Sequence, residues 1–209
     1  MTKEKNQSHN AESGKKSRAG DAAEVREQRL TYDDYAAIDD GLRYELADGR
    51  LELMSPGPTS MHQLVSFEMQ RTIFESCHMN YIVFYSPIDL ILSTYEVRQP
   101  DLLMIHRSRM DIIRMRGIEG TPDLVVEILS PSTLRRDKLD KLRTYARYGI
   151  PEYWVVEPKV GMLEQYVLQG ERYELHNVYE EEEPVSSPTV PCISFTMKGI
   201  MDNIPSIRD

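Results

Sequence analysis

The chain has 209 residues, of which 40% are hydrophobic and 28% charged, and its net charge is −9. This length is enough for one domain with a sizeable core and a tail. No apolar run approaches the roughly 20 residues of a membrane span, and the N-terminus lacks an apolar signal-peptide core, so we expect a cytoplasmic protein without membrane contacts. The acidic balance counts against tight, non-specific nucleic-acid binding, which depends on Lys and Arg neutralising phosphates.

The first 28 residues are mostly polar or charged, which predicts a tail without fixed structure, followed by one domain over 29–209. Thr31 is expected to cap a short helix. Farther on, Asp48-Gly49 separates two strand-like runs and predicts a hairpin. The cysteines, Cys77 and Cys192, form no close pair or zinc-like spacing, so we expect two unbonded apolar side chains in a reducing compartment.

The middle of the chain alternates helix and strand patterns. Ser60 with Gln63 suggests a capping box at the start of a helix that ends near residue 77. Strands are expected over 81–85, 88–92 and 97–105. The strongest buried-strand pattern is TPDLVVEILSPS, over 121–132.

A second helix is expected over 134–149, ending at Gly149 in a left-handed conformation. A strand over 151–158, a hairpin at Gln169-Gly170, an acidic turn over 180–183 and a last edge element over 191–200 complete the pattern. The order of elements predicts one α/β or α+β domain with a mixed β-sheet flanked by helices.

Two acids in the predicted strands are candidates for chemistry. Glu127 is the one charge in an apolar strand, so it must be neutral, paired or bound to a cation. Asp101 follows Pro100 at the start of another strand. Carboxylates on neighbouring strands could share a Mg²⁺ or Mn²⁺ ion, which prefers hard oxygen ligands and retained waters. The alternatives are a structural salt bridge for Glu127 and a turn for Asp101.

The order of these motifs resembles the PD-(D/E)XK nuclease superfamily, and within it the Uma-type family of restriction endonuclease-like proteins. The resemblance rests on segments 44–63, 97–101 and 122–158, and covers about residues 30–200. It implies a restriction-endonuclease-like mixed sheet with additional β-hairpins. It also implies a metal-dependent endonuclease that hydrolyses DNA phosphodiester bonds with a metal-activated water.

The resemblance assigns residues to that site. It implies that Asp101 and Glu127 bind the metal. The usual lysine position, two residues beyond the strand acid, is Leu129 here, and the matching cation is Lys141 in the next helix. The alternative is that Lys141 pairs with Asp137, four residues earlier, on a solvated helix face.

Glu45 and His62 also match the family pattern. Glu45 could be a third carboxylate near the metal, and His62 could hydrogen-bond a carboxylate or contact phosphate. The alternatives are an exposed hairpin acid and a capping or core histidine. Asp89 is a weaker candidate of the same kind.

Other residues point less clearly to the substrate. Two basic segments could meet phosphates or simply be solvated, and Trp154 could stack on a base but fits a core position better. The basic segments contain Arg107, Arg109, Arg114 and Arg116, and Arg135, Arg136, Lys138 and Arg143.

Three functions therefore compete. The first is a DNA endonuclease, in which a homodimer would help to cut both strands. The second is a catalytically inactive nuclease-fold protein that binds nucleic acid or regulates, which Leu129 and the acidic charge favour. The third is a homodimeric interaction module, suggested by eleven methionines.

Overall fold

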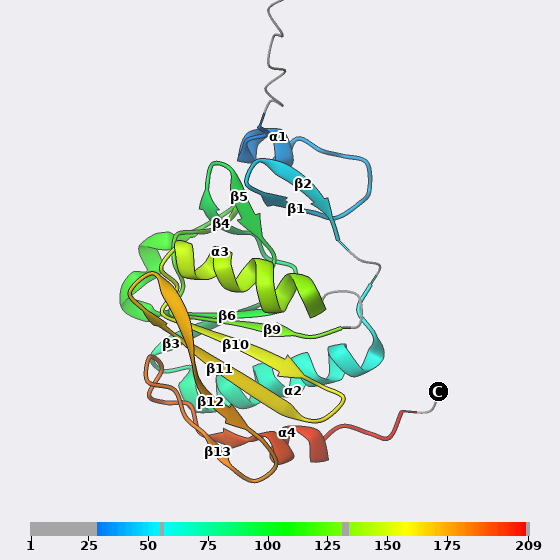
Figure 1. Cartoon of the computed structure of the whole chain (residues 1–209), viewed down its shortest axis with the longest axis vertical. Coiled ribbons are helices and arrows are strands. Elements are labelled where there is room, and N and C mark those ends of the chain that lie inside the picture. Colours follow the sequence, from blue (N-terminus) through cyan, green and yellow to red (C-terminus); the bar gives the residue numbers. More distant parts are fainter. Residues whose placement is uncertain (1–28, 55–56, 131–133, 208–209) are drawn as a thin grey trace, which may run out of the picture.

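The computed structural model describes residues 29–54, 57–130 and 134–207. Within these ranges the strands form two six-stranded sheets and one two-stranded sheet. Helices cover both faces of the six-stranded sheet that contains β9 (Leu124–Ile128) and β10 (Glu152–Glu157), which we call the central sheet (Figure 1). The predicted mixed α+β fold is confirmed. The tail predicted over residues 1–28 lies outside the described residues. No helix of the described chain is long and apolar enough to cross a membrane.

The central sheet carries the strands predicted from the most apolar segments. Its strand order is β12-β11-β10-β9-β6-β3, with β9 and β10 parallel and the other neighbours antiparallel. The parallel pair is joined by the predicted helix, as a crossover connection requires. The bounds are β3 Tyr81–Tyr85, β6 Leu102–His106, β9 Leu124–Ile128, β10 Glu152–Glu157, β11 Met162–Gln169 and β12 Arg172–Tyr179.

Alternation along these strands supplies two apolar faces. Leu102 and Val126 pack with α2 (Ser60–Cys77) and α4 (Met197–Asp202) on one face. Leu103 and Val125 pack on the other face with α3 (Leu142–Arg147). The helix that ends in α3 starts as a π-helical turn, η2 (Arg136–Lys141), a rare form often found at functional sites. As predicted, Gly149 after α3 has a positive φ of 74°.

The hairpin predicted at Gln169-Gly170 is confirmed as β11–β12 of the central sheet, and the hairpin predicted at Asp48-Gly49 belongs to a second sheet. This sheet lies with α1 (Tyr32–Ala36) at the end of the molecule nearest α3 (Figure 1). Asp48-Gly49 connects β1 to β2 as expected, and Thr31 caps α1. The strand order is β2-β1-β5-β4-β8-β7. The bounds are β1 Tyr44–Ala47, β2 Arg50–Leu53, β4 Leu90–Ser93, β5 Glu96–Arg98, β7 Ile113–Arg114 and β8 Gly117–Glu119.

Several expectations were wrong in detail. The strand expected over 97–105 is two strands, β5 and β6, in different sheets, because Pro100 cannot donate to a ladder and interrupts the pairing. The cap of α2 is Thr59, whose hydroxyl accepts from the His62 N–H, rather than Ser60. The element expected over 191–200 is a short strand, β14 (Phe195–Thr196), that pairs with β13 (Pro184–Val185) and continues into α4.

The two cysteines are joined in a disulfide, which overturns the expectation of separate, unbonded side chains. Cys77 ends α2, and Cys192 lies in the segment that leads to β14; their Cα atoms are 5.3 Å apart. The bond links α2 to the C-terminal part of the same core. A sequence separation of 115 residues left no local pattern that could predict it.

Candidate active site

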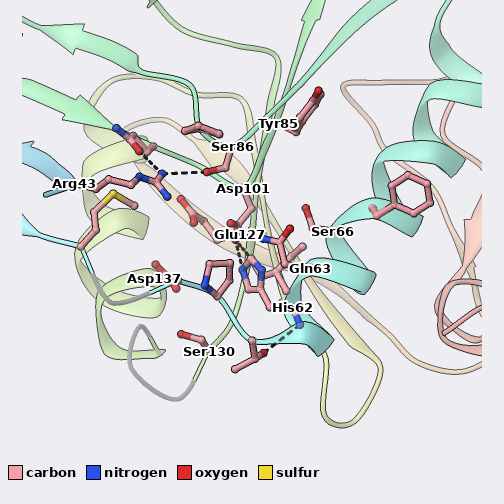
Figure 2. A pocket seen from close by; sticks show the side chains of 18 of the residues that line it. Arg43, His62, Gln63, Ser66, Tyr85, Ser86, Asp101, Glu127, Ser130 and Asp137 are labelled. Carbon is pink, nitrogen blue, oxygen red and sulfur yellow. Dashed lines mark hydrogen bonds and ion pairs between the residues drawn. The ribbon is translucent and has the colours of Figure 1, made fainter. Parts of the chain in front are cut away.

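The predicted site residues converge where the chain passes from the second sheet into the central sheet. His62, Asp101, Glu127 and Lys141 line one cavity of about 600 Å³, and Glu45 contacts Lys141 beside it. Figure 2 shows Asp101, Glu127 and His62 together, with Tyr85 on the side opposite Asp137. The two acids proposed as metal ligands therefore face the same cavity.

Asp101 is fixed by neighbours on both sides. The pairing of Leu102 with Val126 places Asp101 beside Glu127 at the edge of the β6–β9 ladder. Its Oδ2 atom accepts from the backbone N–H of Ile128 at 2.7 Å and lies 3.1 Å from Nε2 of His62. Burial lowers the pKa of His62, but the hydrogen bond and charge of Asp101 outweigh it and raise that pKa. His62 thus hydrogen-bonds a carboxylate, as expected if it belongs to the site.

Glu127 and Lys141 form a buried ion pair. Lys141 Nζ lies 2.7 Å from Glu127 Oε1, and these residues are 2% and 3% exposed. The hydroxyl of Tyr145 donates to the same oxygen at 2.7 Å. The salt bridge considered for Glu127 therefore exists, and its cation is the lysine that the family pattern assigns to the site. Lys141 also lies 3.5 Å from Asp137, so the pairing of the alternative interpretation exists, but both residues are buried and the solvated helix face of that alternative is wrong.

Glu45 is a member of this cluster rather than an exposed hairpin acid. It is fully buried, and its Oε1 accepts from the Gln99 N–H at 2.9 Å and lies 3.3 Å from Lys141 Nζ. Burial alone would raise the pKa of Glu45, but the charges of Lys141 and Arg98 hold it below its usual range. Glu45 therefore remains an anion that shares Lys141 with Glu127.

Arg98 is a buried cation that sequence analysis missed. Its guanidinium lies 2.7 Å from Glu96, 3.1 Å from Glu52 and 3.3 Å from Glu45. All three acids lie in the second sheet, so Arg98 ties strands of that sheet together, and Glu45 makes the contact with Lys141 at the cavity. Its polar neighbours Glu96 and Gln99 gave no sign in the sequence that this arginine is buried.

Of the weaker site candidates, all of which the structure describes, only one basic segment contributes a residue to the cavity lining. Asp89 lies outside the cavity lining and accepts hydrogen bonds from Tyr35 and Gln99. Arg136 lines the cavity, whereas the segment 107–116 does not, and Arg109 there pairs with Asp123. Trp154 is a core residue that packs against α2 and α4, so it has no access to a base.

The donor set fits a hard divalent cation better than a zinc ion. Both hydrogen bonds that Asp101 accepts from described residues go to Oδ2, and both that Glu127 accepts go to Oε1, which leaves one oxygen of each for a ligand. Burial raises the pKa of Glu127, and the charges of Asp137 and Asp101 add to this effect while that of Lys141 opposes it. Among the described residues, no group of three or more His, Cys, Asp or Glu side chains is arranged to hold a metal. Two carboxylates completed by water suit Mg²⁺.

Fold and site together define a protein of the restriction-endonuclease-like nuclease class. The family model described as "Putative restriction endonuclease", Uma2, matches residues 30–198, and the chain belongs to this family. A crystal structure described as a "putative nuclease" from Anabaena variabilis has the same fold, with a TM-score of 0.68, 18% identity, and coverage of 83% of this chain and 98% of that one. None of the curated proteins matches.

Proposed function

We propose that the protein is a metal-dependent endonuclease that hydrolyses phosphodiester bonds in nucleic acid, with DNA as the expected substrate. The observation that carries the proposal is the convergence of Asp101 and Glu127 on one cavity, with Lys141 Nζ 2.7 Å from Glu127. Membership of the nuclease family supports it. The cavity also falls within the range of about 300–1,000 Å³ that is typical of ligand sites.

Each side chain has a role that its contacts suggest. Asp101 and Glu127 would bind Mg²⁺ or Mn²⁺ through the oxygens that accept no hydrogen bond from the described residues. When bound, such an ion polarises a phosphodiester and lowers the pKa of a water molecule. Lys141 supplies a fixed positive charge beside the acids, where phosphate charge develops during hydrolysis. His62 orients Asp101.

A specific observation favours a second candidate, a nuclease-fold protein that binds nucleic acid without cutting it. The ammonium group of Lys141 lies within 3.5 Å of Glu127, Glu45 and Asp137. An ammonium group that contacts three carboxylates must release at least one of them before it can contact a phosphate. Leu129, at the family's usual lysine position, is buried and supplies no second cation.

Nicking of supercoiled plasmid by the purified chain tests the proposal, with Mg²⁺, Mn²⁺ or EDTA present. We expect cleavage only with metal, and its loss in Asp101→Asn and Glu127→Gln. Asp111→Asn and Glu174→Gln change exposed acids outside the cavity and are the matched controls, which should cut like the parent. Circular dichroism checks that each variant is folded. Cutting by folded Asp101→Asn and Glu127→Gln would refute the site, and binding without cutting in any metal would support the second candidate.

A further inference from the structure

Two large aromatic side chains lie exposed at the same cavity as the acids. Phe67 on α2 is 58% exposed and Tyr85 at the end of β3 is 57% exposed, and both belong to the cavity lining. Aromatic side chains normally bury most of their surface in a core. Aromatic rings left open toward a cavity offer flat apolar faces to a ligand.

Rigid elements fix the backbone positions of both aromatic residues. Val65 and Met69, the helical neighbours of Phe67, are fully buried against the central sheet, so α2 turns Phe67 outward in a defined direction. Tyr85 pairs with Leu102 in the β3–β6 ladder, and Leu102 directly follows Asp101 in the chain. The backbone positions from which the rings extend are therefore fixed relative to the acids.

The two walls of the cavity differ in charge. Around Phe67, α2 contributes the uncharged side chains of Gln63, Ser66 and Gln70, and its His62 is engaged by Asp101. The Lys and Arg side chains of the lining come from other elements: Arg43, Arg136 and Lys141. Figure 2 shows Arg43 and Tyr85 on opposite sides of Asp101 and Glu127. Guanidinium groups suit a phosphate, whereas amides, hydroxyls and aromatic rings suit the edges and faces of a nucleobase.

The net charge points the same way. At −9, the chain is a poor candidate for affinity that arises mainly from phosphate neutralisation along a duplex. Stacking of a base on an aromatic ring contributes about 1–3 kcal/mol and does not depend on basic charge. A base can stack on these rings only if it is unpaired, because a base pair within a continuous duplex has its faces covered by its neighbours.

We propose that Phe67 and Tyr85 form a stacking site for an unpaired nucleobase next to the phosphate at Asp101 and Glu127. The substrate class is then single-stranded nucleic acid, or a duplex with an extrahelical nucleotide, rather than continuous duplex. This inference rests on the proposed nuclease function. It adds to that function the reason why an acidic protein binds one strand.

Binding and cleavage are measured separately, so that each can fail alone. Fluorescence anisotropy follows the full chain with a labelled oligonucleotide as a single strand, as a blunt duplex and as the same duplex with a one-nucleotide bulge. A denaturing gel confirms that each probe stays intact. We expect the single strand, and after it the bulged duplex, to bind at least about ten times tighter than the blunt duplex. Phe67→Leu and Tyr85→Leu should each weaken single-strand binding by about 5- to 150-fold, the range that base stacking supplies.

Phe74→Leu is the matched control, because Phe74 is a similarly exposed phenylalanine on α2 that lies outside the cavity lining. It should bind like the parent. Equal binding of the blunt duplex and the single strand would overturn the stacking site, even if plasmid cleavage is found. Losses in Phe74→Leu equal to those in Phe67→Leu and Tyr85→Leu would overturn it as well. If single-strand binding depends on Phe67 and Tyr85 but no cleavage occurs with either Mg²⁺ or Mn²⁺, the stacking site is supported and the nuclease function is refuted.

Discussion

Lys141 and Glu127 form an ion pair of 2.7 Å in which both groups are almost completely buried. Removing one partner of such a pair leaves an uncompensated buried charge, and the cost usually exceeds that of losing a surface pair by several kcal/mol. Here the cost is compounded because Glu45 and Asp137 share the same ammonium group. The pair is consequently a determinant of stability as well as a candidate for chemistry.

Lys141→Met should destabilise the protein by about 3–5 kcal/mol and abolish any metal-dependent cleavage. Methionine keeps most of the side-chain length and removes the charge, so the loss reports the unpaired acids. Urea denaturation gives the free energy of unfolding, and the plasmid assay gives cleavage. Lys138→Met is the control on the same helix: Lys138 pairs with Glu164 near the surface, and its loss should cost at most about 1 kcal/mol. Equal costs for the two variants would show that Lys141 is not held as described.

Arg98→Met should likewise lower the free energy of unfolding by about 3–5 kcal/mol, since Glu45 and Glu96 would lose their buried partner. Arg98→Lys should recover part of this loss, because it restores the charge without the planar fork. Arg114→Met, at an exposed arginine, should stay within about 0.5 kcal/mol of the parent. A near-parental urea midpoint for Arg98→Met would contradict its role as the buried partner of these acids.

Local patterns predicted most elements of the fold. The hairpin at Asp48-Gly49, the cap at Thr31 and the left-handed end at Gly149 depend on a few adjacent residues, and each is confirmed. The assignment of strands to two sheets was not predictable in the same way. Pairing partners are set by contacts between distant segments, and the break at Pro100 decides which sheet receives each half of 97–105.

The site was predictable to the extent that a buried charge is visible in an apolar sequence. Glu127 stood out for that reason, and Asp101 followed from its place after Pro100. Arg98 has one partner nearby in the chain, Glu96, but its burial also depends on the distant Glu45 and Glu52, and the partner of Tyr145, Glu127, is distant as well. These two residues were therefore missed. Nothing in the sequence distinguishes Phe67 from the buried apolar residues of α2, because an apolar count cannot show on which side of a helix the cavity lies.

Mn²⁺ should stabilise the folded chain through Asp101. An ion that binds only the folded state raises the free energy of unfolding by about 2.7 kcal/mol at one hundred times its dissociation constant. We expect a higher melting temperature with Mn²⁺ than with EDTA, and no such difference in Asp101→Asn. Asp111→Asn, at an exposed acid outside the cavity, should keep the full effect. A shift of the same size in Asp101→Asn would place the ion elsewhere.

Asp89→Asn should make the protein more stable at neutral pH. Burial raises the pKa of Asp89, although the hydrogen bonds from Tyr35 and Gln99 oppose that effect. A carboxyl group whose pKa is higher in the folded state favours folding below its unfolded pKa of about 3.9, and that contribution is lost as the pH rises through the folded value. Asparagine keeps the Oδ1 acceptor that both donors use. The variant should therefore match the parent near pH 4 and exceed it at about pH 7.

Asp40 provides the opposite case for the same measurement. The backbone N–H of Leu42 and the hydroxyl of Tyr44 donate to this exposed carboxylate and lower its pKa. A lowered pKa favours folding above the unfolded value, so Asp40→Asn should be less stable than the parent at about pH 7, with the difference shrinking toward pH 4. Urea midpoints for both variants at several pH values should thus diverge from the parent in opposite directions as the pH rises. If both variants moved in the same direction, burial of Asp89 could not be the cause of its effect.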